Sequence, residues 1–426
     1  MSRARISLLV LLTVLLSGIV RAAEPASAQV DPLREEFVQP GLGETIDHDL
    51  RRFATDGFSG AVFIERGGTV ILHHAYGDAD RERRIPNTVD TPFPIGSMTA
   101  QFTAAAVLRL EMEGKLDTND PIGRYFEGLP PEKGKITIHH LLTHRAGFAV
   151  SATPIHEGDW ESFIEAIRDA PIESAPGKQY RPFDAGYSLL AAVIERVSGQ
   201  SFESYTKTAL LEPAGMIHTR FQNEEDREEK LVARGYLSPK TWLPRASRLP
   251  LFRRLLPPFE SSLKRRASQL RPAAPEPYDW GSRGARGLIT TVGDLFRWEL
   301  ALRGNTLLSV DAKDKLFNPF SNELAYGWRF DRTGSGTARN YLTGELPGFQ
   351  CSLCRYADDK MVTIVAANND MGWLLPVRTT VEDATLHGKQ MVLVILFGAI
   401  LLFIILRVSM ARRVPYPHRR RHTIFP

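Results

Sequence analysis

The chain has 426 residues, of which 43% are hydrophobic and 24% charged, a composition typical of a folded globular protein and far from that of a disordered one. It holds only two cysteines, which excludes a disulfide framework and requires a buried core as the source of stability. The formal net charge is +4, but nine of the 53 basic residues lie in residues 1–22 and 407–426, which hold no acid. The remaining 44 basic and 49 acidic residues give the body a net charge of −5, so we predict no nucleic-acid partner.

The N-terminus has the pattern of a secretory signal peptide. Arg3 and Arg5 precede an apolar run over residues 6–20, and small residues follow it. We predict a signal peptide over residues 1–22, with cleavage as late as residue 28. The alternative is an uncleaved signal anchor, which the shortness of the run disfavours.

The sequence pattern of residues 40–385 predicts strands at both ends of this body and helices between them. Such an order favours an α+β domain whose terminal strands share one sheet. A hairpin is expected over residues 58–75, and a second one follows from two β-rich runs near the end. The expected strands are 60–64, 69–72, 350–356 and 361–368, and the expected helices are 99–114 and 187–197. Residues 288–302 predict a turn and then a helix, and residues 136–143 form a short apolar segment.

Residues 239–275 form a basic insertion with a single acid, Glu260. Nine basic residues alternate there with leucines, phenylalanines and prolines. This composition fits contact with an anionic lipid surface, because bases can lie in the headgroups and apolar side chains below them. The alternative is a solvated, irregular loop.

The C-terminus predicts a membrane anchor. Met391 to Leu406 is a run of sixteen residues without a charge, and the segment reaches a membrane-spanning length at Ala411. Arginines crowd residues 412–426, which the positive-inside tendency places in the cytoplasm. We therefore expect a single-pass protein of the cell membrane, with its domain on the periplasmic or extracellular side. A buried C-terminal core helix is the alternative.

Five stretches in order resemble the serine β-lactamase and penicillin-binding-protein family, which includes DD-peptidases and esterases. Residues 91–99 (TPFPIGSMT) resemble the entry to its nucleophile helix, and residues 141–148 (LLTHRAGF) its "LLTHTSG" turn. The other three are residues 176–190, the approach to its second motif, residues 286–295 (RGLITTVGDL), which resemble "GGLYSTVEDL", and residues 347–349 (PGF). The resemblance implies an antiparallel sheet flanked by helices, a helical subdomain, and Ser97 as the nucleophile. No cofactor or metal is implied.

The family's catalytic groups are missing from this sequence. In the resemblance, Ala100 stands where the lysine of Ser-x-x-Lys would take the serine proton, and Pro182 where the tyrosine of Tyr-x-Asn would relay it. Asp184 replaces the asparagine of that motif. In the third motif Leu342 replaces the cation, while Gly344 keeps the glycine that lets a backbone approach closely. We therefore predict a catalytically silent domain that binds a cell-wall fragment or an envelope protein.

Other readings of these residues remain open. Ser97 is either a surviving nucleophile or a helix N-cap, and Asp184 either a substitute base or a capping residue. Tyr180 could serve as the relay after a shift of alignment, and Glu345 could invert the charge preference of the third motif. An active serine hydrolase with an unusual base is thus the alternative function.

The histidines and cysteines predict structural roles. His139, His140 and His144 lack a carboxylate or cysteine cluster that would complete a metal site. Cys351 and Cys354 lie three apart on an expected strand, where side chains point to opposite faces, which opposes both a disulfide and a shared metal.

Overall fold

The computed structural model describes residues 33, 35–149, 159–224, 232–239, 264, 266–320 and 324–386. The predicted signal peptide, membrane helix and cytoplasmic tail, together with residues 240–263 of the basic insertion, lie outside the described residues. Among the helices that are described, none combines the length and apolarity needed to cross a bilayer.

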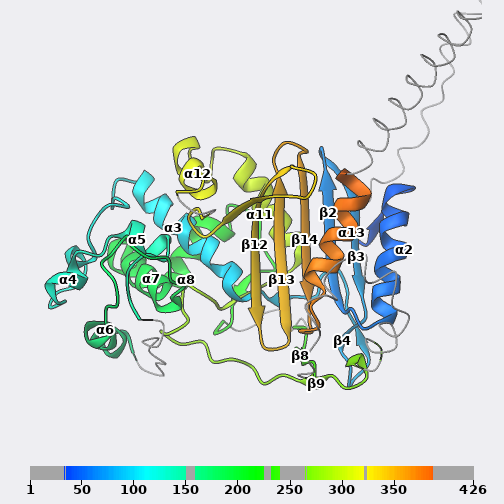
Figure 1. Ribbon diagram of the computed structural model, residues 1–426, viewed down its shortest axis with the longest axis horizontal. Coiled ribbons are helices and arrows are strands. Elements are labelled where there is room, and N and C mark those ends of the chain that lie inside the picture. The colour runs from blue at the N-terminus through cyan, green and yellow to red at the C-terminus, as the bar shows by residue number, and fades with distance from the viewer. Residues whose placement is uncertain are drawn as a thin grey trace, which may run out of the picture.

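A seven-stranded antiparallel sheet forms one side of the domain (Figure 1). Its strand order is β1-β3-β2-β14-β13-β12-β11, so the first and last long strands of the chain lie side by side at its centre. The predicted pairing of terminal strands is therefore confirmed. The bounds are β1 Phe37–Val38, β2 Gly60–Arg66, β3 Thr69–Tyr76, β11 Arg329–Arg332, β12 Ala338–Leu346, β13 Phe349–Tyr356 and β14 Met361–Ala367.

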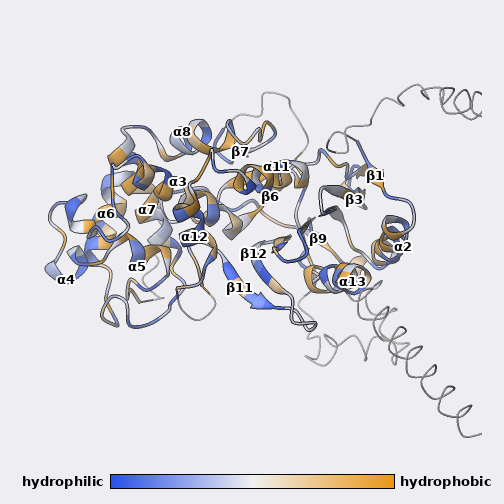
Figure 2. Ribbon diagram, turned by 90° about the horizontal axis from the view of Figure 1, so that it is seen from above, coloured by the Kyte–Doolittle hydropathy of each residue, from blue (hydrophilic) through white to orange (hydrophobic). Residues whose placement is uncertain are grey.

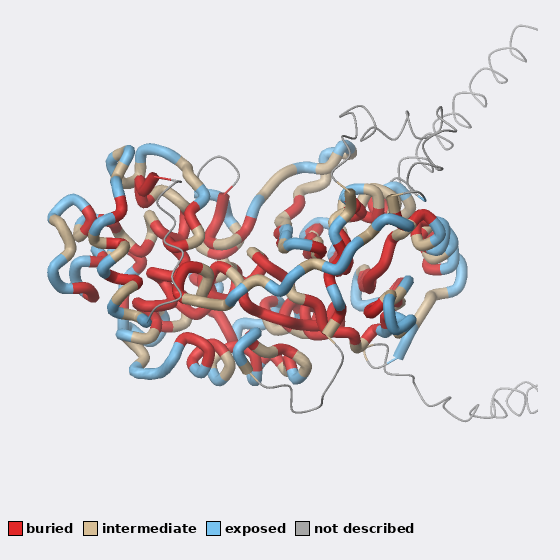
Figure 3. The backbone as a smooth tube through the Cα atoms, turned by 90° about the horizontal axis from the view of Figure 1, so that it is seen from below, coloured by how far each residue is buried: buried red, intermediate tan, exposed pale blue. Residues whose placement is uncertain are grey.

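Two helices cover one face of the sheet. In α2 (Leu42–Thr55) the residues Ile46, Leu50 and Phe53 recur at helical spacing, and all three are buried against the sheet and α13 (Leu374–Leu386). The outward turns of α2 are exposed (Figure 3).

The other face packs against α11 (Val292–Arg303) and α3 (Ala100–Met112), most of whose residues are buried. Beyond α3 lies a helical lobe, at the left of Figure 1. The remaining helices are α4 Pro131–Gly134, α5 Ile138–Leu142, α6 Trp160–Asp169, α7 Asp184–Ser198, α8 Phe202–Thr206 and α12 Val310–Phe317. The predicted α+β architecture with a helical subdomain is confirmed.

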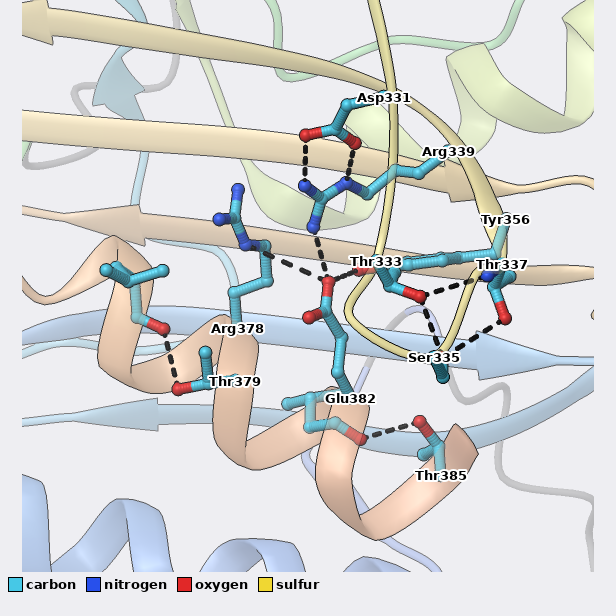
Figure 4. Close-up of polar contacts among 12 residues, drawn as sticks. Asp331, Thr333, Ser335, Thr337, Arg339, Tyr356, Arg378, Thr379, Glu382 and Thr385 are labelled. Atoms are coloured by element: carbon cyan, nitrogen blue, oxygen red, sulfur yellow. Dashed lines mark hydrogen bonds and ion pairs between the residues drawn. The ribbon is translucent and has the colours of Figure 1, made fainter. Parts of the chain in front are cut away.

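Glu382 fastens the last turns of α13 to the sheet (Figure 4). Its Oε1 accepts hydrogen bonds from Tyr356 Oη, at 2.6 Å, and from Arg339 Nη1. Arg339, which is only 5% exposed, also pairs with Asp331 through its Nε, at 2.8 Å. This network joins α13 to β12, β13 and the short edge strand β11, which is hydrophilic (Figure 2).

The sheet fixes the opposite orientation of the two cysteines. Cys351 belongs to the core on the α3 side and Cys354 to a separate small cluster with Tyr356 and Leu386. Both are free and fully buried, and burial raises the pKa of the Cys351 thiol to about 12. The prediction of two structural cysteines on opposite faces is confirmed.

Short strands complete the fold around the sheet. They form a three-stranded sheet of β6 (Phe93–Pro94), β10 (Leu288–Thr290) and β7 (Arg220–Phe221), with β10 in the middle. A small hairpin pairs β4 (Asp78–Asp80) with β5 (Ile85–Pro86). The two ends of the basic insertion are held together by β8 (Tyr236–Leu237) and β9 (Arg271–Pro272).

Candidate functional site

Ser97 lies in a 3-10 turn, Gly96–Thr99, between β6 and α3. Gly96 adopts a φ of +54°, a left-handed conformation that favours glycine. The Ser97 side chain is half-buried, and its hydroxyl makes no hydrogen bond to any residue in the described part of the chain. The turn begins after Ile95 and α3 after Thr99, so the expectation that Ser97 caps the helix is wrong.

The two positions that would carry a cation beside Ser97 are apolar. Ala100, the first residue of α3, offers only a methyl group. Leu342 is 6% exposed and belongs to the same apolar cluster as Ile95 and Met98. A charged amine at position 342 would lose its hydration there. Neither Ala100 nor Leu342 therefore substitutes for the missing lysines.

Gly344 brings strand β12 against the Ser97 turn. A Cβ built on Gly344 would lie 1.8 Å from the backbone oxygen of Ile95, a distance that no side chain can tolerate. On the other side, a Cβ on Gly96 would lie 3.2 Å from the backbone nitrogen of Glu345. The close backbone approach on which an oxyanion site depends is thus retained, as the third motif predicted.

The side chain of Glu345 projects from the other face of the sheet. The register pairs Gly344 with Cys351, on the α3 side, whereas Glu345 pairs with Gln350, which in turn pairs with Ala367 on the α2 side. Its carboxylate accepts a weak hydrogen bond from Gln350 Nε2 at 3.4 Å. This placement argues against a charge inversion at Ser97 by Glu345.

Asp184 is committed to an arginine rather than to Ser97. It is the first residue of α7, and its Oδ2 lies 2.7 Å from Arg286 Nη2. Arg286 also reaches Glu276 Oε2 through Nη1 at 2.8 Å. Phe183 is the N-cap of α7 and no side chain caps it, so Asp184 is neither a base for Ser97 nor the cap that the sequence suggested.

The sequence patterns did not predict the pairing of Arg286 with Glu276, although the position of Arg286 differs from the family pattern. Arg286 stands where the family pattern begins with glycine. The segment that follows it borders the Ser97 turn, because Leu288 accepts a hydrogen bond from Ile95 N at 3.1 Å and donates one to Thr99 Oγ1 at 3.3 Å. Arg286 thus lies two residues before the strand residue that contacts the Ser97 turn, and its guanidinium pairs with Asp184 and Glu276.

Tyr180 also has a partner other than Ser97. Its hydroxyl accepts a hydrogen bond from Arg329 Nη2 at 3.1 Å, which links the segment before α7 to the edge strand β11. The position expected for the relay is taken by Pro182, which is exposed and has no proton to transfer. The structure brings together Ser97, Ala100, Leu342 and Gly344, and leaves the second motif without a relay.

The three histidines hold local structure. His140 Nδ1 accepts a hydrogen bond from Thr137 N at 3.1 Å, and His144 Nδ1 accepts one from Phe183 N at 3.4 Å. His139 Nδ1 lies 2.7 Å from Tyr326 Oη. Burial of its ring lowers the pKa of His144 to about 4. No group of three potential metal ligands occurs among the described residues.

The comparison with protein families decides the classification of this chain. The Beta-lactamase family model matches residues 46–382. The chain belongs to the beta-lactamase family. Solved structures show the same fold: FmtA from Staphylococcus aureus (TM-score 0.67, 24% identity, 82% of this chain and 91% of that one) and D-amino acid amidase from Ochrobactrum anthropi SV3 (TM-score 0.64, 21% identity, 82% and 99%).

Curated relatives of this beta-lactamase family member include penicillin-binding proteins and a hydrolase. It is 25% identical to penicillin-binding protein 4* and 31% identical to the putative penicillin-binding protein PbpX, both of Bacillus subtilis. These matches cover 79% and 69% of this chain, and 72% and 66% of the relatives. The teichoic acid D-alanine hydrolase of Staphylococcus aureus is 31% identical over 44% of this chain and 46% of its own length.

Proposed function

We propose that this family member binds a ligand or partner at the cell envelope without hydrolysing it. The observation that carries the proposal is the isolation of the Ser97 hydroxyl, which has no hydrogen-bond acceptor among the described residues. A serine hydroxyl is a poor nucleophile unless a neighbouring group takes its proton. Because a positioned base contributes about 10²- to 10⁴-fold in rate, losing base, relay and cation together leaves little turnover.

The same proposal includes the membrane. We infer that residues 1–22 export the chain and residues 391–411 anchor it, with residues 412–426 in the cytoplasm. The ligand is then a cell-wall fragment or a neighbouring envelope protein. The names of the relatives, which include penicillin-binding proteins and a teichoic acid D-alanine hydrolase, support an envelope ligand of this kind.

A second candidate function is slow acyl transfer by Ser97. It is favoured by the approach of Gly344 to Ile95, because the backbone donors that would stabilise an oxyanion do not depend on the lost side chains. A reactive ester or a strained amide would then acylate Ser97 without an efficient base.

Active-site labelling separates the two functions. The full-length protein in detergent is incubated with a fluorophosphonate probe and with a fluorescent penicillin, beside Ser97→Ala. The binding proposal expects no labelling above that of Ser97→Ala, whereas stoichiometric, Ser97-dependent labelling would establish a hydrolase. A third arm adds Ala100→Lys, Pro182→Tyr and Leu342→Lys, and a gain of labelling there shows that the scaffold is competent.

Binding itself needs a separate measurement. Purified muropeptides are titrated into the full-length protein by calorimetry, with a Gly344→Val variant as the control, because a branched side chain at that position must push β12 away from the Ser97 turn. Saturable binding to the unmodified protein that the variant lacks supports a ligand site at Ser97. Equal binding to both proteins places the ligand elsewhere.

A further inference from the structure

The segment that leads into the basic insertion packs on backbone close in sequence to the Ser97 turn. Segment 233–237 crosses the turn between β12 and β13, where Tyr236 N donates to Gly348 O at 3.3 Å. Its first residue, Ala233, donates to Pro92 O at 3.0 Å, just ahead of the Ser97 turn. The next contact along this segment is the backbone of Arg234 with Ala79 of β4, at 2.8 Å.

Basic side chains gather where this segment meets the β4–β5 hairpin. We call the following residues the stem patch: Arg81, Arg83, Arg84, Arg234 and Arg266. Arg81 donates through Nη1 to Ala267 O at 3.0 Å and lies over the Tyr236 ring, which fixes the hairpin to the insertion. Arg266 donates to Ser238 Oγ at 3.2 Å from the other end of the insertion.

The stem patch is only partly neutralised. Glu82 lies 3.5 Å from Arg234, Asp370 is near Arg266, and Asp80 Oδ1 accepts a hydrogen bond from Arg83 N at 2.9 Å, so three acids face the five arginines. Arg83 and Arg84 are exposed and make no ion pair with any residue that the structure describes. The Nε and Nη1 atoms of Arg266 are buried and have no hydrogen-bond partner among the described residues, and burial lowers the pKa of its guanidinium. The patch therefore keeps a net positive charge on a body that is acidic as a whole.

The patch lies at the end of the sheet away from the point where α13 finishes. Tyr236 bridges to Asn369, just before α13 begins, whereas the end of α13 lies at Arg66, which donates to Thr385 O at 2.7 Å. If the chain after Leu386 runs to a bilayer, as proposed, that bilayer would lie at the opposite end of the sheet from the stem patch. The placement favours a ligand of the envelope space over the headgroups of the protein's own membrane.

We propose that the stem patch binds an anionic polymer chain of the envelope, one with repeated phosphate or carboxylate groups, and leads it towards Ser97. Arginines suit this role because their planar guanidinium groups hold carboxylate or phosphate oxygens in pairs. This inference names the ligand class of the proposed binding function and rests on it.

The test uses the full chain in nanodiscs of phosphatidylcholine, so that no anionic lipid is present. End-labelled long-chain polyphosphate is the probe, and fluorescence anisotropy reports binding at several salt concentrations. The triple variant Arg83→Gln, Arg84→Gln, Arg234→Gln should bind about tenfold more weakly and with a shallower salt dependence, as expected when charge contacts are removed. The matched control Arg51→Gln, Arg52→Gln, Arg196→Gln carries the same charge change away from the patch and should bind like the unmodified protein.

Each other outcome overturns the proposal. Equal weakening by both triple variants means that net charge alone acts, and no binding by the unmodified protein means that the patch is not a polymer site. Binding to phosphatidylglycerol vesicles but not to polyphosphate makes a lipid surface the partner instead. Ser97 labelling is measured on the same samples, so a hydrolase would be recognised independently of whether the patch binds polymer.

Discussion

Asp184 and Arg286, two residues 102 positions apart, form an ion pair of 2.7 Å that joins the start of α7 to the segment before β10. Each departs from its family motif, the first by replacing an asparagine and the second a glycine. Without Arg286, the partly buried Asp184 would lose the cation that pairs with it, whereas Arg286 has a second partner in Glu276. The second motif has therefore been rebuilt around a new contact rather than simply emptied.

This pair predicts a measurable coupling. Arg286→Ala should lower the free energy of unfolding by about 1 kcal/mol, because Asp184 and Glu276 then repel each other at a site one-third exposed to solvent. The double variant Arg286→Ala, Asp184→Asn should recover part of that loss. Urea denaturation of the two single variants and the double variant measures the coupling, and strictly additive losses would contradict it.

The backbone contact at Gly344 predicts a large effect from one methyl group. Gly344→Ala places a Cβ against Ile95 O, and β12 must move, so we expect a loss of about 3 kcal/mol in the free energy of unfolding. Gly334→Ala is the matched control, since nothing lies within 4 Å of its added Cβ. Its stability should change by less than about 0.5 kcal/mol. Similar losses in both variants would mean that the tight approach at Ile95 is not what matters.

The network at Glu382 predicts that removing Arg339 lowers the free energy of unfolding more than neutralising the carboxylate of Glu382 does. Arg339→Met leaves Glu382 and Asp331 without their shared cation, at an expected cost of about 3–5 kcal/mol. Glu382→Gln keeps an oxygen that accepts from Tyr356, so its loss should be smaller. Thermal unfolding ranks the variants, and hydrogen exchange should rise in β11 for Arg339→Met. Unchanged exchange in β11 would show that the strand is held by its backbone ladder alone.

The lowered pKa of His144 predicts that the folded protein loses stability in mild acid. Its pKa falls from 6.5 to about 4 on folding, so between these values the unfolded chain binds the proton more readily than the folded one. Stability therefore falls as the pH drops from about 6.5 to 4, by about 3 kcal/mol from this residue. His144→Asn tolerates the backbone φ of 53° and should flatten that slope in denaturation measured at pH 7, 5.5 and 4.5. An unaltered slope would assign the acid sensitivity to other groups.

The parts of the fold that depend on local pattern were predictable. Alternating β-rich runs gave both hairpins, and alanine- and leucine-rich stretches gave α3 and α7 within a few residues of their observed bounds. Counting from neighbouring motifs placed Leu342 and Gly344 on the strand that borders Ser97, because the separations within one strand or helix are fixed by geometry.

The remainder depends on contacts between distant segments. The ion pairs Asp184–Arg286 and Arg339–Glu382 join elements that no local pattern relates. The capping role suggested for Ser97 failed because the chain enters a 3-10 turn at Gly96, which shifts the helix start to Ala100. The face on which Glu345 lies likewise required the strand register.

The direction of α13 determines how far the Ser97 turn would lie from a bilayer entered by the chain after this helix. Its last residue lies at the end of the sheet marked by Arg66 and Met361, and Gly344 lies near the other end, level with Ala366. The seven residues of β14 span about 20 Å between these ends. Residues 387–390 add at most about 13 Å before the proposed anchor begins. If residues 391–411 anchor the chain as proposed, the length of the sheet separates Gly344, and with it the Ser97 turn, from the end at which the chain leaves for the membrane.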